Sequence, residues 1–422
     1  MTSETAAAAV SRGRRNAVLA LLLIAYIFNF LDRQLLAILA GPIKADLNLS
    51  DTQFGAIGGL AFALLYSVLG VPLAMLADRT SRSGVITGAL TVWSGFTALC
   101  GIATGYWQLF LFRLGVGVGE AGGVAPSYAL IADYFPPEQR GRALGTFSLG
   151  VPVGLSCGTL LGAYIAHWFD WRTAFLVMGA AGLILAPVFK LVVRDLPRAP
   201  GAADAAPLRA VFPILARKPA FWLMAFAASF SSLCGYGLAL WTPSVLIRSY
   251  DFSMIQAGQF LGSLGLIGGV AGVLGGGILA DRLGKIDKRW YARLPAIAWL
   301  ITAPTFCAGL LIPNPMISWP LLLIPNALNI LWLGPVVTAV QHLVPVRMRA
   351  TASASFLLIN NLIGLGVGPL LIGKISEMLK GSYGVESLRY AAVSVLGFYL
   401  LAALLMLLAV PRLTREWVED EA

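Results

Sequence analysis

Two charged side chains lie inside a stretch that is apolar enough to cross a membrane. Residues 106–134 read YWQLFLFRLGVGVGEAGGVAPSYALIADY and carry Arg113 and Glu120. A charge at membrane depth costs at least ~2.5–3.5 kcal/mol, so such a side chain normally faces a partner or a water-filled cavity. On one helix the two side chains should share nearly the same face, about 10 Å apart along the axis. The chemistry open to them is ion pairing, proton transfer or the binding of a charged group.

The same stretch should be thin and bent. Its glycines remove side-chain bulk and let a neighbouring helix or a ligand approach closely. They are Gly115, Gly117, Gly119, Gly122 and Gly123. Pro126 follows them and favours a bend in the helix.

A second pair of charges, Asp32 and Arg33, lies in the apolar run 17–40, at a depth compatible with one shared cluster. We expect Arg33 to pair with both carboxylates and Arg113 to bind an anionic head group by forked hydrogen bonds. Making or breaking such a pair changes the proton affinity of the carboxylate, so Asp32 is the first candidate proton carrier and Glu120 the second. The alternative is a pair of buried salt bridges that only fix helix packing, although such pairs often add little stability.

Composition defines the class of protein. The chain has 422 residues, of which 58% are hydrophobic and only 12% are charged, whereas soluble domains have roughly 25% charged residues. The sequence therefore predicts an all-α integral membrane protein. The net charge of +10 is explained by membrane topology rather than by nucleic acid, since no basic cluster with interleaved aromatic residues lies outside the apolar runs. The sequence shows no nucleotide, zinc or hydrolase motif, so we expect no enzyme, cofactor or metal.

Twelve apolar runs are long enough to span a bilayer. They cover approximately residues 17–40, 54–77, 85–104, 107–132, 142–166, 172–194, 219–247, 255–280, 292–312, 318–342, 350–374 and 387–411. Segment 195–218 is rich in proline, alanine and charge, which predicts a cytoplasmic linker between an N-terminal six-helix bundle (17–194) and a C-terminal one (219–411). Lys and Arg are concentrated at the termini and in the loops on the same side, so both termini are predicted to be cytoplasmic.

The two bundles contain a repeated loop. Ala74-Met-Leu-Ala-Asp78-Arg79-Thr-Ser-Arg82 follows the second run, and Gly277-Ile-Leu-Ala-Asp281-Arg282-Leu-Gly-Lys285 follows the eighth. Such a repeat implies two halves related by an axis along the membrane normal, with a site between them near the midplane.

Twelve spans, a central linker and this loop in both halves resemble the major facilitator superfamily. Within it, Asn29-Phe-Leu-Asp32-Arg33 and Gly117-Val-Gly-Glu120-Ala, followed by Pro126 and Asp133, resemble the Spinster family. That resemblance implies a proton-linked carboxylate–arginine network that handles lysolipid-like substrates, including sphingosine 1-phosphate. Anion:cation symporters of the same superfamily carry similar motifs and move small organic anions.

The resemblance also implies a charged gate at the cytoplasmic helix ends. Pairs between helices would hold the outward-facing state and release in the inward-facing one, whereas a solvated anchor is the alternative. The candidate gate residues are Asp78, Arg79, Arg82, Asp133, Arg140, Arg142, Asp281 and Arg282. Asp78 could also cap the third helix or pair with Arg142.

Polar residues of the apolar runs provide candidates for a cavity lining, with helix-packing hydrogen bonds as the alternative role. The candidates are Asn29, Tyr66, Tyr236, Asn326, Asn329, Asn360 and Asn361. Those in the C-terminal half are all neutral. A cavity that is charged on one wall and largely apolar on the other suits an anionic or zwitterionic head group with a hydrocarbon tail.

The sequence is compatible with three functions. The first is a proton-coupled secondary transporter that moves an amphipathic, lipid-like substrate by alternating access. The alternatives are a symporter or facilitator for a small organic anion and a non-transporting membrane sensor. We expect a monomer in the inner membrane of a bacterium, with protons and a lipid-like molecule as its partners and no nucleic acid.

Overall fold

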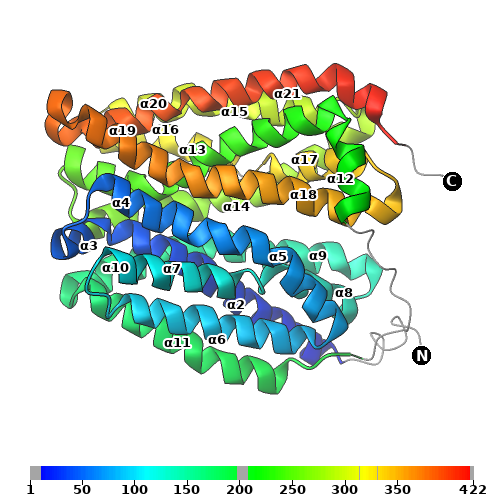
Figure 1. Ribbon diagram of the computed structural model, residues 1–422, viewed down its shortest axis with the longest axis horizontal. Helices are drawn as coiled ribbons and strands as arrows, with labels where there is room; N and C mark the ends of the chain where they lie inside the picture. Colours follow the sequence, from blue (N-terminus) through cyan, green and yellow to red (C-terminus); the bar gives the residue numbers. More distant parts are fainter. Residues whose placement is uncertain (1–10, 197–207, 313, 330, 419–422) are drawn as a thin grey trace. The chain divides into compact units, whose positions relative to one another are not determined.

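The computed structural model describes residues 11–196, 208–312, 314–329 and 331–418. Every regular element within these residues is a helix, and none of them is a strand. Eleven helical runs in this part of the chain are long and apolar enough to cross a membrane. The predicted class, an all-α integral membrane protein, is therefore confirmed (Figure 1).

Contacts group the chain into two compact units, the first of which comprises Met1–Ala202 and Phe252–Leu266. Before residue 252 its helices are α2 (Arg12–Ile38), α3 (Ala40–Leu47), α4 (Asp51–Ala56), η1 (Ile57–Ala61), α5 (Phe62–Arg79), α6 (Arg82–Cys100), α7 (Tyr106–Glu120), α8 (Val124–Tyr134), α9 (Pro137–Ser148), α10 (Gly150–Trp168) and α11 (Trp171–Val192). Helix α6 packs against α7 and α11, and α2 packs against α10.

The second unit comprises Ala203–Asp251 and Ile267–Ala422. Its helices are α12 (Leu208–Ala216), α13 (Pro219–Ser249), the later part of α14 (Met254–Ile286), α15 (Trp290–Leu311), α16 (Pro315–Leu328), α17 (Leu333–Gln341), η2 (Val346–Met348), α18 (Arg349–Asn361), η3 (Leu362–Val367), α19 (Gly368–Tyr383), η4 (Gly384–Glu386), α20 (Ser387–Val395) and α21 (Gly397–Glu416). Helix α13 packs against α21, η3 and α19, and α15 packs against α16 and α21.

The last apolar run, Val346–Glu416, contains two crossings. It has 71 residues, and one straight helix of that length would measure roughly 100 Å, about three times the thickness of a hydrocarbon core. The chain reverses at η4 instead, where Gly384 has a φ of +53°, and α19 and α20 pack together (Figure 1). With this run divided, the described residues provide the twelve predicted spans.

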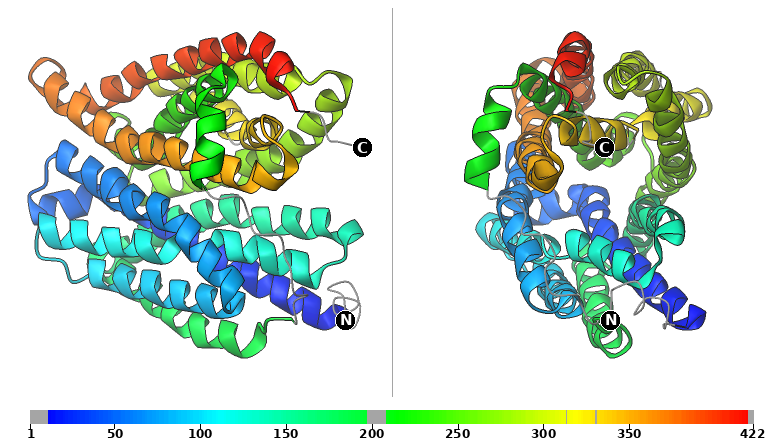
Figure 2. Two further views of the ribbon diagram at one scale, coloured as in Figure 1. Left: turned by 45° about the vertical axis from the view of Figure 1, so that its right-hand side comes forward. Right: turned by 90° about the vertical axis from the view of Figure 1, so that its right-hand side faces the viewer.

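Part of the predicted linker, 195–218, is helical. Helix α12 lies within it and packs against α18. In both ribbon views α12 runs across the direction of α18 rather than along it (Figures 1 and 2). The predicted bundle limits, 17–194 and 219–411, stay a prediction, and the compact units divide the chain within α14, after Leu266.

Polar side chains define where several helices begin. Ser50 and Gln53 form a reciprocal capping box at the start of α4. The Asp170 carboxylate accepts the Thr173 N–H at 2.6 Å at the start of α11, and this hydrogen bond lowers the pKa of Asp170. Each cap satisfies a backbone donor that the first helical turn leaves unpaired.

The glycine-rich run is divided and tightly packed. Helix α7 ends at Glu120 and α8 begins at Val124, so the predicted bend falls just before Pro126. A Cβ atom on Gly117 would lie 2.4 Å from the Phe62 carbonyl oxygen. Side chains larger than hydrogen are therefore excluded where α7 crosses the start of α5.

Candidate functional site: a buried charge cluster in the first unit

Asp32 and Arg113 form a salt bridge between α2 and α7. Arg113 Nη1 donates to Asp32 Oδ2 at 2.8 Å, and the Thr97 hydroxyl on α6 donates to Asp32 Oδ1 at 2.9 Å. The side chains of Arg113 and Asp32 are only 2% and 4% exposed. Both carboxylate oxygens of Asp32 are therefore hydrogen bonded within the helix bundle, away from water.

A second salt bridge joins the same two helices. Arg33 Nε and Nη2 donate to Glu120 Oε2 at 2.9 and 2.8 Å. The Arg33 guanidinium also lies 4.9, 4.6 and 5.0 Å from the ring centres of Phe30, Phe62 and Tyr66. Aromatic faces stabilise a cation by their quadrupole. Arg33 is thus held by one carboxylate and by a cage of three rings.

The predicted cluster of four charges exists, but one of its pairings differs from the sequence expectation. Arg33 pairs with Glu120 as expected, whereas Asp32 receives its hydrogen bonds from Thr97 and Arg113. The sequence predicts that Arg113 binds an anionic head group, yet its Nη1 forms a salt bridge with Asp32. Consecutive residues on a helix point about 100° apart, which is why neighbours such as Asp32 and Arg33 reach different partners on α7.

Several polar atoms in this cluster lack a hydrogen-bond partner among the described residues. They are Glu120 Oε1, Arg113 Nε and both amide atoms of Asn29. Asn29 lies one helical turn before Arg33 and is 2% exposed, and Glu120 is fully buried. A buried polar atom without a partner is costly and usually has a functional reason. The cluster therefore retains capacity to bind a proton or a polar group.

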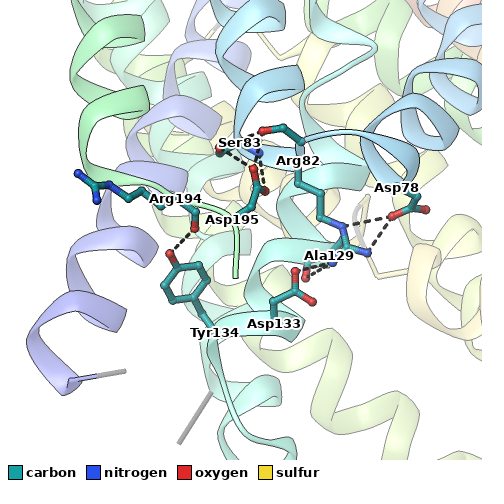
Figure 3. Close-up of polar contacts among 9 residues, drawn as sticks. Asp78, Arg82, Ser83, Ala129, Asp133, Tyr134, Arg194 and Asp195 are labelled. Atoms are coloured by element: carbon teal, nitrogen blue, oxygen red, sulfur yellow. Dashed lines mark hydrogen bonds and ion pairs between the residues drawn. The ribbon is translucent and has the colours of Figure 1, made fainter. Parts of the chain in front are cut away.

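The predicted gate residues of the first unit are partly assembled around Arg82 (Figure 3). Arg82 Nη2 donates to Asp78 at 2.8 Å, and Arg82 Nη1 donates to Asp133 at 2.5 Å. The same Nη1 lies 3.4 Å from the Ala129 carbonyl oxygen. These contacts tie the start of α6 to the ends of α5 and α8. The cap of α6 is Ser81, which accepts the Gly84 N–H, so Asp78 does not take the capping role that was one of its alternatives.

The other gate candidates have different environments. Arg140 Nε donates to the Phe135 carbonyl oxygen at 3.0 Å, within the same loop and helix start. Arg79, Arg142 and Arg282 are exposed. The side chain of Asp281 lies outside the described residues, so its predicted pairing is untested.

A set of polar contacts beside the candidate gate residues was not predicted from the sequence. The Asp195 carboxylate accepts hydrogen bonds from the Ser83 N–H at 3.1 Å, from the Ser83 hydroxyl at 3.0 Å and from the Ser81 hydroxyl. Next to it, the Tyr134 hydroxyl donates to the Arg194 carbonyl oxygen at 2.5 Å (Figure 3). The chain leaving α11 is thus fixed to α6 and α8. Asp195 is the first residue of the segment predicted as a polar linker. Because charged residues are common in such a linker, this one did not stand out.

The polar candidates of the second unit mostly bond within the bundle. The Ser232 hydroxyl donates to Asn360 Oδ1 at 2.9 Å, and Asn360 Nδ2 lies 3.5 Å from Asn361 Oδ1. Asn329 accepts a hydrogen bond from the Tyr399 hydroxyl at 3.1 Å, and Asn326 donates to the backbone of its own helix at 2.9 Å. Tyr236 is half-buried on α13. These contacts favour a packing role for Asn326, Asn329 and Asn360.

Comparison with known proteins defines the class. A family model described as Major Facilitator Superfamily matches residues 22–369. The chain therefore belongs to the Major Facilitator Superfamily, and it is a membrane transporter rather than an enzyme. Human protein spinster homolog 1 is 30% identical over 401 residues, which cover 89% of this chain and 75% of that protein. Within the superfamily, the chain is a relative of the Spinster proteins, as the sequence motifs predicted.

Two further relatives agree with this assignment. An MFS-type efflux pump of Mycolicibacterium smegmatis is 36% identical over 399 residues, which cover 93% of this chain and 92% of the pump. A crystal structure of a bacterial homologue of the human lysosomal transporter Spinster, inward-facing and unoccupied, has a TM-score of 0.86 and 29% identity. The match covers 98% of this chain and 100% of that one.

Proposed function

We propose that the protein is a proton-coupled secondary transporter that moves an amphipathic anionic or zwitterionic lipid by alternating access. The observation that carries this proposal is the pair of buried salt bridges, Asp32–Arg113 and Glu120–Arg33, between two membrane-spanning helices. Buried ion pairs add little net stability, so their presence at membrane depth favours a functional role.

The salt bridges provide a means of coupling to protons. A carboxylate that accepts a proton loses the charge that holds its arginine, so protonation and ion pairing oppose each other. The arginine released in this way, Arg33 or Arg113, would then be available to bind a substrate or to take part in a change of conformation. Glu120 is suited to this step because its Oε1 has no hydrogen-bond partner among the described residues. Asp32 has both oxygens occupied and would exchange a proton only when Arg113 or Thr97 moves.

Arg33 is the better placed residue for an anionic head group. Its side chain is 13% exposed, compared with 2% for Arg113. The rings of Phe30, Phe62 and Tyr66 beside it offer apolar surface next to the charge. This arrangement supports a substrate with one charged end.

Orientation and location are part of the proposal. The distribution of Lys and Arg supports cytoplasmic termini. Relatives that include a bacterial efflux pump support the inner membrane of a bacterium and transport out of the cytoplasm. We propose that one chain is sufficient for transport, because the four charges lie within a single compact unit.

Transport into proteoliposomes under an imposed pH gradient tests proton coupling. We expect Asp32→Asn and Glu120→Gln each to abolish the dependence of substrate movement on the gradient, because a carboxamide does not ionise near neutral pH. Arg347→Gln, at an exposed position of η2, is the control and should transport normally. Unchanged pH dependence in both carboxamide variants would rule out the proposed coupling.

A competition experiment distinguishes a lipid substrate from a small organic anion, the alternative substrate class that follows from the sequence. A lysophospholipid or sphingoid phosphate should inhibit transport and raise the melting temperature of the purified protein, and Arg33→Ala should remove both effects. A small carboxylate that competes where these lipids do not would assign the protein to the organic anion class. Binding of either ligand with no flux would support the sensor, which the family assignment does not favour.

A further inference from the structure

A groove lies on the second unit between α13 and α21. The two helices run antiparallel, since Phe230 of α13 contacts Phe398 of α21 at a ring distance of 5.4 Å, whereas the Lys218 ammonium donates to the Glu416 carbonyl oxygen at 3.0 Å. The start of α13 is therefore beside the end of α21 (Figures 1 and 2). The groove between them has a volume of about 640 Å³.

The floor of the groove is aromatic. Trp222, Phe226 and Phe230 recur every fourth residue, so they form one stripe along α13 that extends for about 12 Å. Trp222 and Phe226 stack at 5.8 Å, and Phe226 and Phe230 lie 6.4 Å apart. Leu401 and Leu405 of α21 form the opposite wall. Most of this stripe is within a membrane-spanning helix, where the surrounding solvent is hydrocarbon.

One end of the groove is basic. Arg217 precedes α13 and Arg412 is one turn before the end of α21, and both line the groove and are exposed. Among the described residues no carboxylate lies within salt-bridge distance of either guanidinium group, and Glu416, one turn after Arg412, interacts with it electrostatically. Lys218 beside them contacts Glu416. The charged end therefore presents two guanidinium groups with donors available to an anion, directly beyond the apolar stripe.

We propose that this groove binds one acidic glycerophospholipid of the surrounding membrane. Its phosphate would receive charge-assisted hydrogen bonds from Arg217 and Arg412, and one acyl chain would lie along Trp222, Phe226 and Phe230. Basic pockets between membrane helices are suited to acidic head groups, and guanidinium groups bind phosphate through parallel N–H donors. An apolar stripe of this length fits about half of an acyl chain. A soluble anion has no apolar chain that would contact this stripe.

The bound lipid would also hold α12 in place. Trp222 Nε1 donates to the Ala216 carbonyl oxygen at 3.1 Å, and the Trp222 ring contacts Phe212 of α12 at 6.2 Å. Arg217 follows α12 directly. A phosphate that joins Arg217 to Arg412 therefore connects this short helix to α21. Occupancy of the groove should thus stabilise the second unit as a whole.

Native mass spectrometry of the detergent-purified, delipidated protein tests the proposal. The probes are phosphatidylglycerol and phosphatidylcholine with identical acyl chains. We expect one phosphatidylglycerol to bind in clear preference to phosphatidylcholine and to raise the melting temperature. The double variant Arg217→Gln/Arg412→Gln should bind phosphatidylglycerol about tenfold more weakly or worse. Trp222→Leu/Phe226→Ala should weaken the binding of both lipids.

A matched control and a soluble anion complete the experiment. Arg12→Gln/Arg347→Gln removes two exposed arginines elsewhere and should bind phosphatidylglycerol as the unchanged protein does. Glycerol 1-phosphate, which has the head-group chemistry without acyl chains, should not shift the melting temperature at the same concentration. Equal binding of the two lipids, or full binding by the Arg217/Arg412 double variant, would overturn the proposal. Stabilisation by glycerol phosphate alone would replace it with an anion site.

Discussion

Asp32 and Arg113 depend on each other because water reaches neither of them. Removing one member of a buried ion pair leaves an uncompensated charge, which is more harmful than losing both members. The Thr97 hydroxyl cannot replace the guanidinium, since it supplies one neutral hydrogen bond. The stability of the first unit should therefore respond to these residues as a pair and not as independent contributions.

This dependence predicts a rescue. Arg113→Met should destabilise the protein by about 3–5 kcal/mol, because Asp32 is then buried without a cation. The double variant Asp32→Asn/Arg113→Met should recover most of that loss, yet remain unable to couple transport to protons. Thermal unfolding in detergent measures the first effect and pH-driven flux the second. A double variant that is no more stable than Arg113→Met would show that the pair is not energetically coupled.

At this scale the sequence predicted the members of the cluster but not all of its contacts. Asp32, Arg33, Arg113 and Glu120 were recognisable because a charge in an apolar run is rare. The pairing of Asp32 with Arg113 depends on the rotation of α2 against α7, which no residue spacing defines. Thr97 gave no signal, since a threonine in a membrane helix usually bonds to its own backbone.

Helix α7 approaches α5 and α6 closely enough for glycines to contact the neighbouring backbone. A Cβ on Gly117 would meet the Phe62 carbonyl oxygen, and one on Gly119 would lie 2.4 Å from the backbone nitrogen of Trp93. Small residues at helix crossings allow this close approach in membranes. Gly117 thereby contacts the backbone of Phe62, whose ring lies 4.6 Å from the Arg33 guanidinium of the charge cluster.

A single methyl group should therefore disturb the cluster from a distance. Gly117→Ala should destabilise the protein by about 1–3 kcal/mol, because the neighbouring backbone has to move. Gly88→Ala on α6 is the matched control, since its new methyl group meets no atom within 4 Å. The control should be neutral or stabilising by up to about 1 kcal/mol. Melting temperatures in detergent compare the two, and equal values would contradict the close-packing argument.

Elements were predictable where a long apolar run defined them and less so elsewhere. The membrane helices follow from hydropathy, and the break before Pro126 was expected. The π-helical turns η1 and η3 were not, because a single wide turn arises from packing and leaves no pattern in the sequence. Helix α12 was concealed in a segment whose proline and charge content is typical of a linker.

At the scale of the whole molecule, the orientation in the membrane is a prediction that labelling can test. Phe169, between α10 and α11, is 73% exposed, and Ser11 precedes α2. Cytoplasmic termini place Phe169 on the periplasmic side of the membrane, because α2 and the four spans after it separate the two positions.

Membrane-impermeant maleimide should label Phe169→Cys in intact cells, and Ser11→Cys only after lysis. Cys157→Ser and Cys307→Ser remove the native thiols that are not fully buried and provide a clean background. The control is the protein that carries only Cys157→Ser and Cys307→Ser, without either new cysteine. Labelling of Ser11→Cys in intact cells would contradict the proposed topology and indicate the opposite orientation.

The four charges of the cluster add up to zero within one compact unit. Under the proposed coupling, each proton that Asp32 or Glu120 accepts leaves a net positive charge in the interior of the membrane. An electric field acts on such a charge with about 2.3 kcal/mol per 100 mV for a complete crossing. Voltage, as well as acidity, would then bias which side of the membrane the loaded protein faces.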